Sequence, residues 1–288
     1  MTKDFAKSIK AKLLNIARKD RVDYQVLLIR YLYERLLYRL AVSRFREKFC
    51  LKGGALLYAL EQEFARPTLD IDLLGIRIKN DAKVMKEIFM EIMAIPFKDD
   101  GVVFDATSIQ TEKIAENRKY HGIRLIFTAR LDSIRQTMKI DIGFDDAVVP
   151  APQSLTYPVL ISNLPVPDIL AYSLETVVAE KFHAMIDLAE SNSRYKDFYD
   201  VYRILSQNKL DEKILTEAIL ATFHHRKTIF RTNHPIFTDD FINDQNRNLQ
   251  WKRFLKKIKH NEDLTFATVM SLIKSKLQPI VENNLIGT

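Results

Sequence analysis

The stretch that decides the fold is residues 51–75, LKGGALLYALEQEFARPTLDIDLLG. An apolar run ends at Gly53 and Gly54, two of only seven glycines in the 288 residues, and an amphipathic segment then leads to Asp70 and Asp72. A Gly pair that ends a strand and opens a helix lets backbone N–H groups approach a triphosphate, because no Cβ stands in the way. The pattern predicts a strand, a phosphate-binding turn, a helix and a second strand that carries carboxylates.

The two carboxylates of this stretch are expected to share one face of the second strand. Side chains alternate along a strand, so Asp70 and Asp72 project to one side while Ile71 points to the other. Their Cα atoms would lie about 7 Å apart, and a hard divalent cation such as Mg²⁺ relieves the repulsion between the two charges. Solvated acids at a strand edge are the alternative.

A third acid has a similar setting. Asp141 stands between two isoleucines in MKIDIGF, residues 138–144, which is a further predicted strand. If this strand lies beside the one that carries Asp70 and Asp72, three carboxylates converge and can hold two Mg²⁺ ions for phosphoryl transfer. The pair Asp145 and Asp146 follows in the expected turn, and we interpret both as surface acids.

A lysine and two acids in the later part of the chain are further candidates. Lys181 borders an apolar helical stripe, so it either reaches inward to a phosphate or lies at the surface beside a neighbouring glutamate. Asp197 and Asp200 are three residues apart and share a helix face. Asp197 can orient Lys181 or contact the nucleotide, or it can simply cap the helix that begins there.

The order of the predicted elements indicates the fold class. Residues 1–50 have helical spacing, with Asp23 as an N-cap and leucines at every fourth position from Leu28 to Leu40. Short β-rich runs follow up to a proline-rich interval, which includes an antiparallel hairpin around residues 132–137. Helical periodicity returns from about residue 168. We therefore expect an α+β (α/β) fold with a small mixed sheet.

The predicted domains are residues 1–165, with the N-terminal helices and the sheet, and residues 166–288, a C-terminal helical domain. The formal net charge is +7, and the first fifty residues hold thirteen Lys or Arg against five Asp or Glu. A second basic cluster, residues 245–260, surrounds Trp251. It either grips a phosphate backbone while Trp251 stacks on a base, or is a solvated helix face with Trp251 turned inward, which we favour.

The chain has the composition of a soluble cytoplasmic protein. No apolar run is long enough for a membrane helix, and the N-terminal residues lack the apolar core of a secretory signal. Cys50 is the only cysteine, which excludes an internal disulfide and a zinc site built from cysteines. We expect Cys50 to be a small buried side chain.

The combination of several stretches resembles a known family. LKGGALLYAL, RPTLDIDLLG, KIDIGF, AEKFHAM and NSRYKDFYDVYRIL, between about residues 49 and 206, are similar to the AbiEii/AbiGii nucleotidyltransferase toxins, within the DNA polymerase β-like nucleotidyltransferase superfamily. The resemblance implies a polymerase β-like core and Mg²⁺-dependent transfer of a nucleotide from an NTP to RNA. It further implies tRNA 3′ ends as acceptors, inhibition of growth, and a cognate antitoxin in a toxin–antitoxin or abortive-infection system.

The resemblance also assigns roles to residues. Gly53 and Gly54 match the glycine motif, Asp70 and Asp72 the metal-binding pair, Asp141 the third acid, Lys181 the later lysine, and Asp197, or alternatively Asp200, the final aspartate. The family usually has Gly-Asp where this chain has Asp145-Asp146. From the residues themselves, we add Arg66, Lys52 and Arg124 as candidate triphosphate contacts.

Two other functions fit the same residues. One is nucleotide transfer to a hydroxyl of a protein or a small molecule. The other is a catalytically dormant protein that binds RNA or a partner through its basic N-terminal helices.

Overall fold

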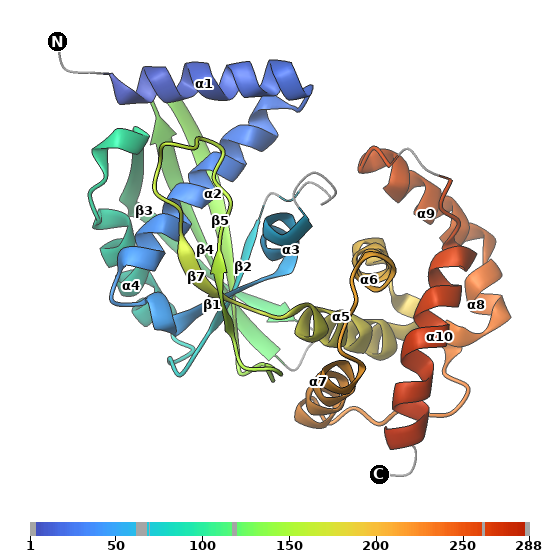
Figure 1. Ribbon diagram of the computed structural model, residues 1–288. Coiled ribbons are helices and arrows are strands. Elements are labelled where there is room, and N and C mark those ends of the chain that lie inside the picture. The colour runs from blue at the N-terminus through green and yellow to red at the C-terminus, as the bar shows by residue number, and fades with distance from the viewer. Residues whose placement is uncertain (1–3, 62–67, 69, 117–119, 261–262, 286–288) are drawn as a thin grey trace. The chain divides into compact units, whose positions relative to one another are not determined.

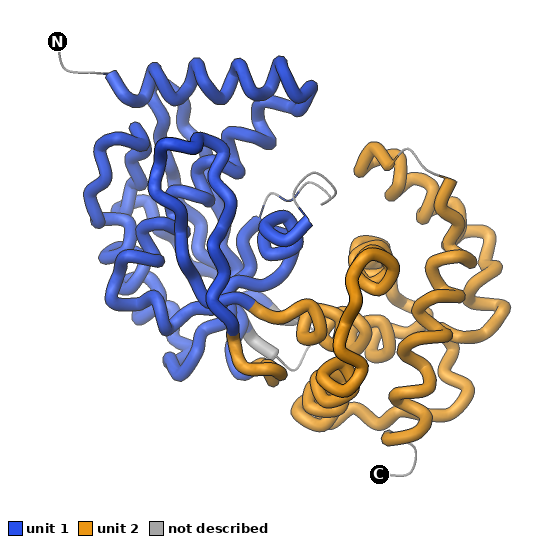
Figure 2. Tube along the Cα trace, in the orientation of Figure 1, with its two compact units in different colours: residues 1–145, 153–171 blue, residues 146–152, 172–288 orange. Residues whose placement is uncertain are grey.

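The structure is a computed structural model that describes residues 4–61, 68, 70–116, 120–260 and 263–285. The chain divides into two compact units (Figure 2), residues 1–145 with 153–171 and residues 146–152 with 172–288. The sequence predicts one boundary between residues 165 and 166, whereas the second unit resumes at Tyr172, because the preceding strand belongs to the sheet of the first unit.

The strands that the structure describes form one seven-stranded sheet in the first unit, in the order β3-β4-β5-β2-β1-β7-β6 (Figure 1). Their bounds are β1 Phe49–Lys52, β2 Ile71–Gly75, β3 Val102–Glu116, β4 Tyr120–Leu131, β5 Ile134–Phe144, β6 Gln153–Thr156 and β7 Asp168–Ala171. β2 and β5 are parallel, as are β1 and β7, and the other neighbouring pairs are antiparallel. The predicted mixed sheet and the β4–β5 hairpin are confirmed.

Strands β6 and β7 lie where the sequence predicts only a proline-rich crossover and the beginning of the helical part. The helical part begins instead at Leu174, after the N-cap Ser173. Residues 168–171 are extended because their backbone pairs with β1, where Cys50 faces Leu170 and Leu51 faces Ala171.

The helices of the first unit are α1 Phe5–Asp20, α2 Tyr24–Val42, α3 Gly53–Glu61 and α4 Ala82–Ala94, with short 3-10 turns at Arg46–Lys48 and Lys98–Asp100. The Asp23 carboxylate accepts N–H groups of Gln25 and Val26 at 2.8 and 3.2 Å, so the predicted N-cap of α2 is confirmed. The leucines of α2 from Leu28 to Leu40 are buried, as is Cys50. α4 packs against β3 and β4, and α3 contacts β1 and β2.

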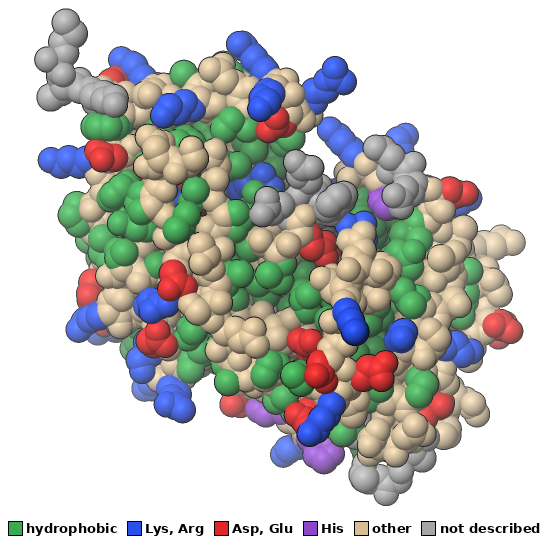
Figure 3. All heavy atoms as spheres, viewed as in Figure 1, with side chains coloured by type: hydrophobic (Ala, Val, Ile, Leu, Met, Phe, Trp, Pro, Cys, Tyr) green, Lys and Arg blue, Asp and Glu red, His purple; other side chains and the backbone are tan. Residues whose placement is uncertain are grey.

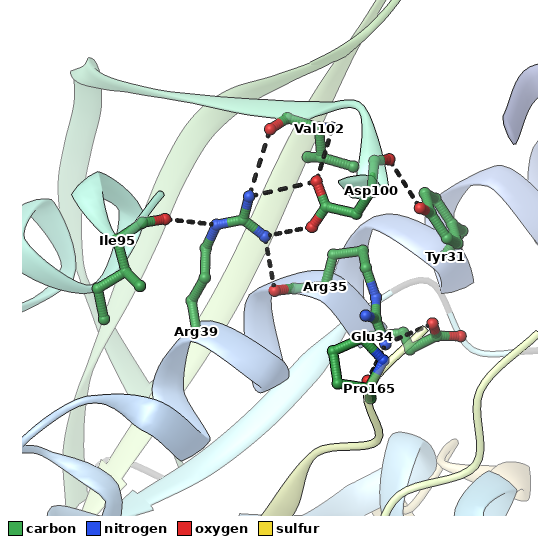
Figure 4. A network of polar contacts seen from close by, with 8 residues as sticks. All are labelled: Tyr31, Glu34, Arg35, Arg39, Ile95, Asp100, Val102 and Pro165. Atoms are coloured by element: carbon green, nitrogen blue, oxygen red, sulfur yellow. Dashed lines mark hydrogen bonds and ion pairs between the residues drawn. The ribbon is translucent and has the colours of Figure 1, made fainter. Parts of the chain in front are cut away.

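Helix α2 also carries two arginines into the core (Figure 4). The Arg39 guanidinium donates to the Asp100 carboxylate at 2.7 Å, and the Arg35 guanidinium pairs with Glu34 at 2.7 Å and donates to the Pro165 carbonyl at 3.0 Å. Both arginines are almost completely buried. Part of the positive charge of the first fifty residues is therefore internal. Figure 3 shows Lys and Arg side chains along the outer side of α1.

The second unit is helical after its first residues. Its helices are α5 Leu174–Leu188, α6 Tyr195–Gln207, α7 Glu212–His225, α8 Asp239–Asn243, α9 Gln245–Lys257 and α10 Phe266–Leu285, with 3-10 turns at Ala189–Ser191 and Pro235–Phe237. α5 packs against α6 and α7, and α10 packs against the same two helices. No helix in the described ranges is long and apolar enough to cross a membrane.

Trp251 belongs to the aromatic core of this unit. Its side chain is 1% exposed, its indole N–H donates to the Leu264 carbonyl at 2.7 Å, and its ring lies 5.6 Å from that of Phe266. The predicted inward orientation is confirmed, and base stacking on Trp251 is wrong, because the packed ring has no free face.

Candidate active site

The turn between β1 and α3 brings the two halves of the opening stretch together. Gly53 begins α3 directly after β1 and has a φ of +67°, a backbone conformation that L side chains rarely adopt. A Cβ on Gly53 would lie 2.7 Å from the Cγ of Asp72, and closer still to its Oδ2. Only a glycine therefore lets the Asp72 carboxylate lie against the N-terminus of α3. Gly54 follows in the first turn and is buried.

A row of charged residues crosses the sheet beside this turn. The register pairs Lys52 of β1 with Asp72 of β2, Asp72 with Asp141 of β5, and Asp141 with Arg124 of β4. Direct partners on neighbouring strands lie on the same face of a sheet. The strand of Asp141 thus lies beside that of Asp72, which is the condition that the sequence left open. Lys52 is 7% exposed and takes part in this row rather than standing apart.

Asp70 lies just before β2 and is exposed. It nevertheless belongs to the same neighbourhood, because the charges of Asp70, Asp141 and Asp72 all act on the hydroxyl of Tyr33 in α2. Burial is the largest cause that raises the pKa of Tyr33, and the three carboxylates raise it further. The hydroxyl donates to the Lys139 carbonyl at 2.7 Å, so it links α2 to β5, the strand that carries Asp141.

Arg124 forms a bidentate ion pair with Asp141, the third acid. The Nε and a terminal nitrogen of Arg124 each donate to one oxygen of the Asp141 carboxylate at 2.7 Å. These hydrogen bonds raise the pKa of the Arg124 guanidinium, to which the charges of Asp141 and Asp70 also contribute. Arg124, suggested by the sequence as a triphosphate contact, is here the countercharge of Asp141.

The donor set suits a hard cation in its chemistry. Asp72 and Asp141 offer carboxylate oxygens, the ligand type that Mg²⁺ prefers, from adjacent positions of the sheet, and Asp70 stands two residues from Asp72. In the part of the chain that the structure describes, however, no group of three or more His, Cys, Asp or Glu side chains is already gathered for a metal ion. Arg124 donates to both oxygens of Asp141, so a metal ion would compete with the guanidinium for them. Arg66 lies outside the described residues.

The later candidates form a separate cluster within the second unit. Lys181 of α5 contacts Asp197 and Asp200 of α6, with its ammonium 2.7 and 2.9 Å from their carboxylates, and Arg194 contacts Asp197 at 2.7 Å. Lys181 is therefore not a surface lysine beside a glutamate. Asp197 does not cap α6, whose N-cap residue is Arg194.

The electrostatics of this cluster keep Asp197 ionised. Its side chain is fully buried, which by itself disfavours the charge. The charges of Lys181 and Arg194 outweigh that effect, so the pKa of Asp197 is lowered. Lys181 holds both acids at once, and the structure thus gives Asp197 and Asp200 the same partner.

One acid of the predicted turn is not at the surface. The Asp146 side chain is 6% exposed, and Arg226, the C-cap residue of α7, contacts its carboxylate at 3.2 Å, while the Tyr172 hydroxyl donates to it at 3.2 Å. The prediction of a surface acid is wrong for Asp146, because Arg226 supplies a buried countercharge. His183 is also structural, since its Nε2 lies 2.6 Å from the Thr228 hydroxyl. No local pattern predicts the Arg226 pair, because Arg226 and Asp146 are 80 residues apart in the sequence, whereas the Arg124 pair follows from the register of the β4–β5 hairpin.

Comparisons with known proteins match most of the chain. The model of a family described as nucleotidyl transferase AbiEii toxin, type IV toxin–antitoxin system, matches residues 35–272. A crystal structure described as a candidate nucleotidyltransferase from H. pylori has a TM-score of 0.53 at 16% identity, and the match covers 91% of this chain and 97% of that one. This likeness shows the fold.

JHP933 from Helicobacter pylori is similar at 14% identity with a TM-score of 0.45, over 91% of this chain and 97% of that one. No curated protein matches the sequence.

Proposed function

The chain belongs to the AbiEii nucleotidyl transferase toxin family of type IV toxin–antitoxin systems, and we propose that it transfers a nucleotide from an NTP to RNA with the help of Mg²⁺. The observation that carries the proposal is the placement of Asp72 and Asp141 at paired positions of β2 and β5, with Asp72 against the glycine turn. The family implies an antitoxin as partner. The tRNA 3′ end is the first acceptor to test, and the reaction belongs in the cytoplasm.

The residues of the first unit have separate roles in the proposed reaction. Asp70, Asp72 and Asp141 would hold Mg²⁺, which supplies charge stabilisation for the transferring phosphoryl group. Gly53 and Gly54 present backbone N–H groups at the beginning of α3 to the triphosphate. Lys52 and Arg124 flank the acids on either side and balance their charge until the substrate is bound.

The transfer itself is a single displacement. The acceptor hydroxyl oxygen forms a bond to the α-phosphorus of the NTP, and the bond from that phosphorus to the bridging oxygen breaks, so pyrophosphate leaves. Asp141 takes the hydroxyl proton, because it is the acid at the far end of the pair from the glycine turn. Arg124 donates to both Asp141 oxygens and therefore competes with this proton for the carboxylate.

Lys181 supplies a fixed positive charge in the second unit. Asp197 and Asp200 hold its ammonium on two sides, which orients it and limits its motion. The family resemblance gives Lys181 a role in the reaction, and we propose that the two acids position its ammonium for that role.

The test offers each α-labelled NTP to the purified protein together with total RNA, protein or small-molecule acceptors. The wild type should label RNA, Asp70→Ala should not, and a control substitution of an exposed α4 acid, Glu87→Ala, should leave labelling unchanged. Label on protein or on a small molecule would replace RNA as acceptor. Retained labelling by folded Asp70→Ala would refute the assignment of the acids, and RNA binding without any labelling would indicate a dormant site.

A further inference from the structure

A pocket of about 560 Å³ lies in the second unit. It lies between residues 190–193 and the side of α9 that carries Asn246, Gln250, Arg253 and Lys257, and we call it the α9 pocket. These four residues follow one another at helical spacing over about 16 Å, so they form one continuous stripe. The volume falls in the range of pockets for small ligands such as a nucleotide.

The charge of the α9 pocket favours an anion. Helix α9 contains five Lys or Arg and no Asp or Glu, and Arg247, Arg253 and Lys257 line the pocket. Two acids, Glu190 and Asp244, line it as well. The Asp244 carboxylate is already occupied, since it accepts the Arg247 N–H at 2.6 Å as the N-cap of α9. Arg253 and Lys257 are exposed and available to a ligand.

A buried donor in the pocket wall has no partner. Asn192 is 2% exposed; its Oδ1 accepts the Arg194 N–H at 2.8 Å, while its Nδ2 has no hydrogen-bond partner among the described residues. The Nε of Arg247 is likewise buried without a hydrogen-bond partner there. A buried unpaired donor costs about 1–3 kcal/mol. Both atoms belong to residues that line the pocket.

Two aromatic side chains complete the pocket. Tyr195, at the beginning of α6, and Phe254 of α9 are both half-buried, and both line it. Beneath them Trp251 is buried and packs 6.3 Å from Tyr195 and 5.5 Å from Phe254 between ring centroids, which fixes their orientation. Aromatic faces between cationic side chains are typical of sites for single-stranded nucleic acid.

We propose that the α9 pocket binds single-stranded RNA, with Arg253 and Lys257 on successive phosphates and a base against Tyr195 or Phe254. The inference rests on the proposed function, because it names the place where the RNA acceptor is held. The pocket also adjoins the lysine cluster within the same unit. Asn192 holds the backbone of Arg194, whose side chain contacts Asp197, the partner of Lys181.

The test measures fluorescence anisotropy of a labelled single-stranded oligoribonucleotide of about ten nucleotides with the full-length protein over a range of salt concentrations. Each phosphate contact contributes about 0.7 to the slope of log affinity against log salt. Arg253→Gln with Lys257→Gln should lower the slope by about 1.4 and weaken binding at least tenfold at low salt. The control pair Lys213→Gln with Lys276→Gln removes two exposed lysines elsewhere in the unit and should change neither quantity.

A second variant separates binding from folding. Asn246→Asp adds an acid to the first turn of α9, where the helix dipole favours a negative charge, so this variant should be at least as stable as the wild type. The added charge faces the proposed RNA path, and binding should weaken several-fold. Wild-type RNA affinity in both Asn246→Asp and the double variant would overturn the inference. It would also be overturned if these variants lost NTP binding while they bound RNA as the wild type does.

Transfer of label by the wild type is measured on the same preparations. If the wild type labels RNA while the α9 variants bind RNA normally, this inference is refuted and the proposed function stands. If the wild type labels no RNA while the α9 variants lose RNA binding, the proposed function is refuted and the RNA pocket stands.

Discussion

Gly53→Ala tests the link between the glycine turn and the acids. The added Cβ would lie 2.7 Å from the Cγ of Asp72 and closer still to its Oδ2, and ordinary contact begins at 3.4 Å, so the carboxylate must retreat by more than about 0.7 Å. Alanine at a φ of +67° adds strain of about 1–2 kcal/mol. Because misplacing a catalytic group by about 1 Å can lower a reaction rate about hundredfold, the rate of nucleotide transfer should fall by about two orders of magnitude.

Gly101→Ala is the matched control. Gly101 has a φ of +65°, and a Cβ there would lie 2.5 Å from the Cα of Ala6, away from the acids. Denaturant unfolding should show a loss of about 1–3 kcal/mol in both variants. Initial rates of label transfer per folded molecule should fall only in Gly53→Ala. Equal rates in the two variants would refute the reasoning that Asp72 depends on this glycine.

Three further substitutions have outcomes that follow from single ion pairs. Asp100→Asn should destabilise the protein by about 3–5 kcal/mol in denaturant unfolding, because Arg39 stays buried without its countercharge; a loss below about 1 kcal/mol would contradict this. Lys181→Gln should lower the free energy of unfolding by about 3 kcal/mol near neutral pH. The loss should be smaller at pH values below 3.8, the ordinary pKa of an aspartate, because the lowered pKa of Asp197 stabilises the fold only while that carboxylate is ionised; a loss independent of pH would contradict this. Arg124→Gln should change stability by less than about 1 kcal/mol and should tighten Mn²⁺ binding measured by electron paramagnetic resonance, whereas weaker binding would show that the arginine does not compete with the metal.

Elements with strong local signals are those that the sequence predicts well. Helix α2 has both a capping aspartate, Asp23, and leucines at helical spacing, and the β4–β5 hairpin needs only neighbouring residues. Strands β6 and β7 are four residues long, β6 lies between Pro152 and Pro158, and β7 directly follows Pro167, so their local pattern is weak. They form because β7 pairs with β1, which lies more than a hundred residues earlier in the chain, and pairing over that distance produces no periodic pattern in the local sequence.

The features of the candidate site likewise divide into those with a local sequence signal and those that depend on long-range pairing. Alternation along one strand predicts a common face for Asp70 and Asp72, and the glycine pair predicts the turn. The placement of Asp141 beside Asp72 depends on the pairing of β5 with β2, two strands far apart in the sequence, so no single segment contains it. Composition also misleads for Arg39, since a count of charges cannot distinguish a buried ion pair from a basic surface.

The central claim is that the paired acids of β2 and β5 perform nucleotide transfer. Asp72→Asn tests it most directly, because the amide keeps the size of the side chain beside Gly53 and removes only its charge. The measurement is the initial rate of transfer from a labelled NTP to RNA by the folded variant and by the wild type. The account predicts a loss of at least about hundredfold. A rate within about twofold of the wild type would contradict it.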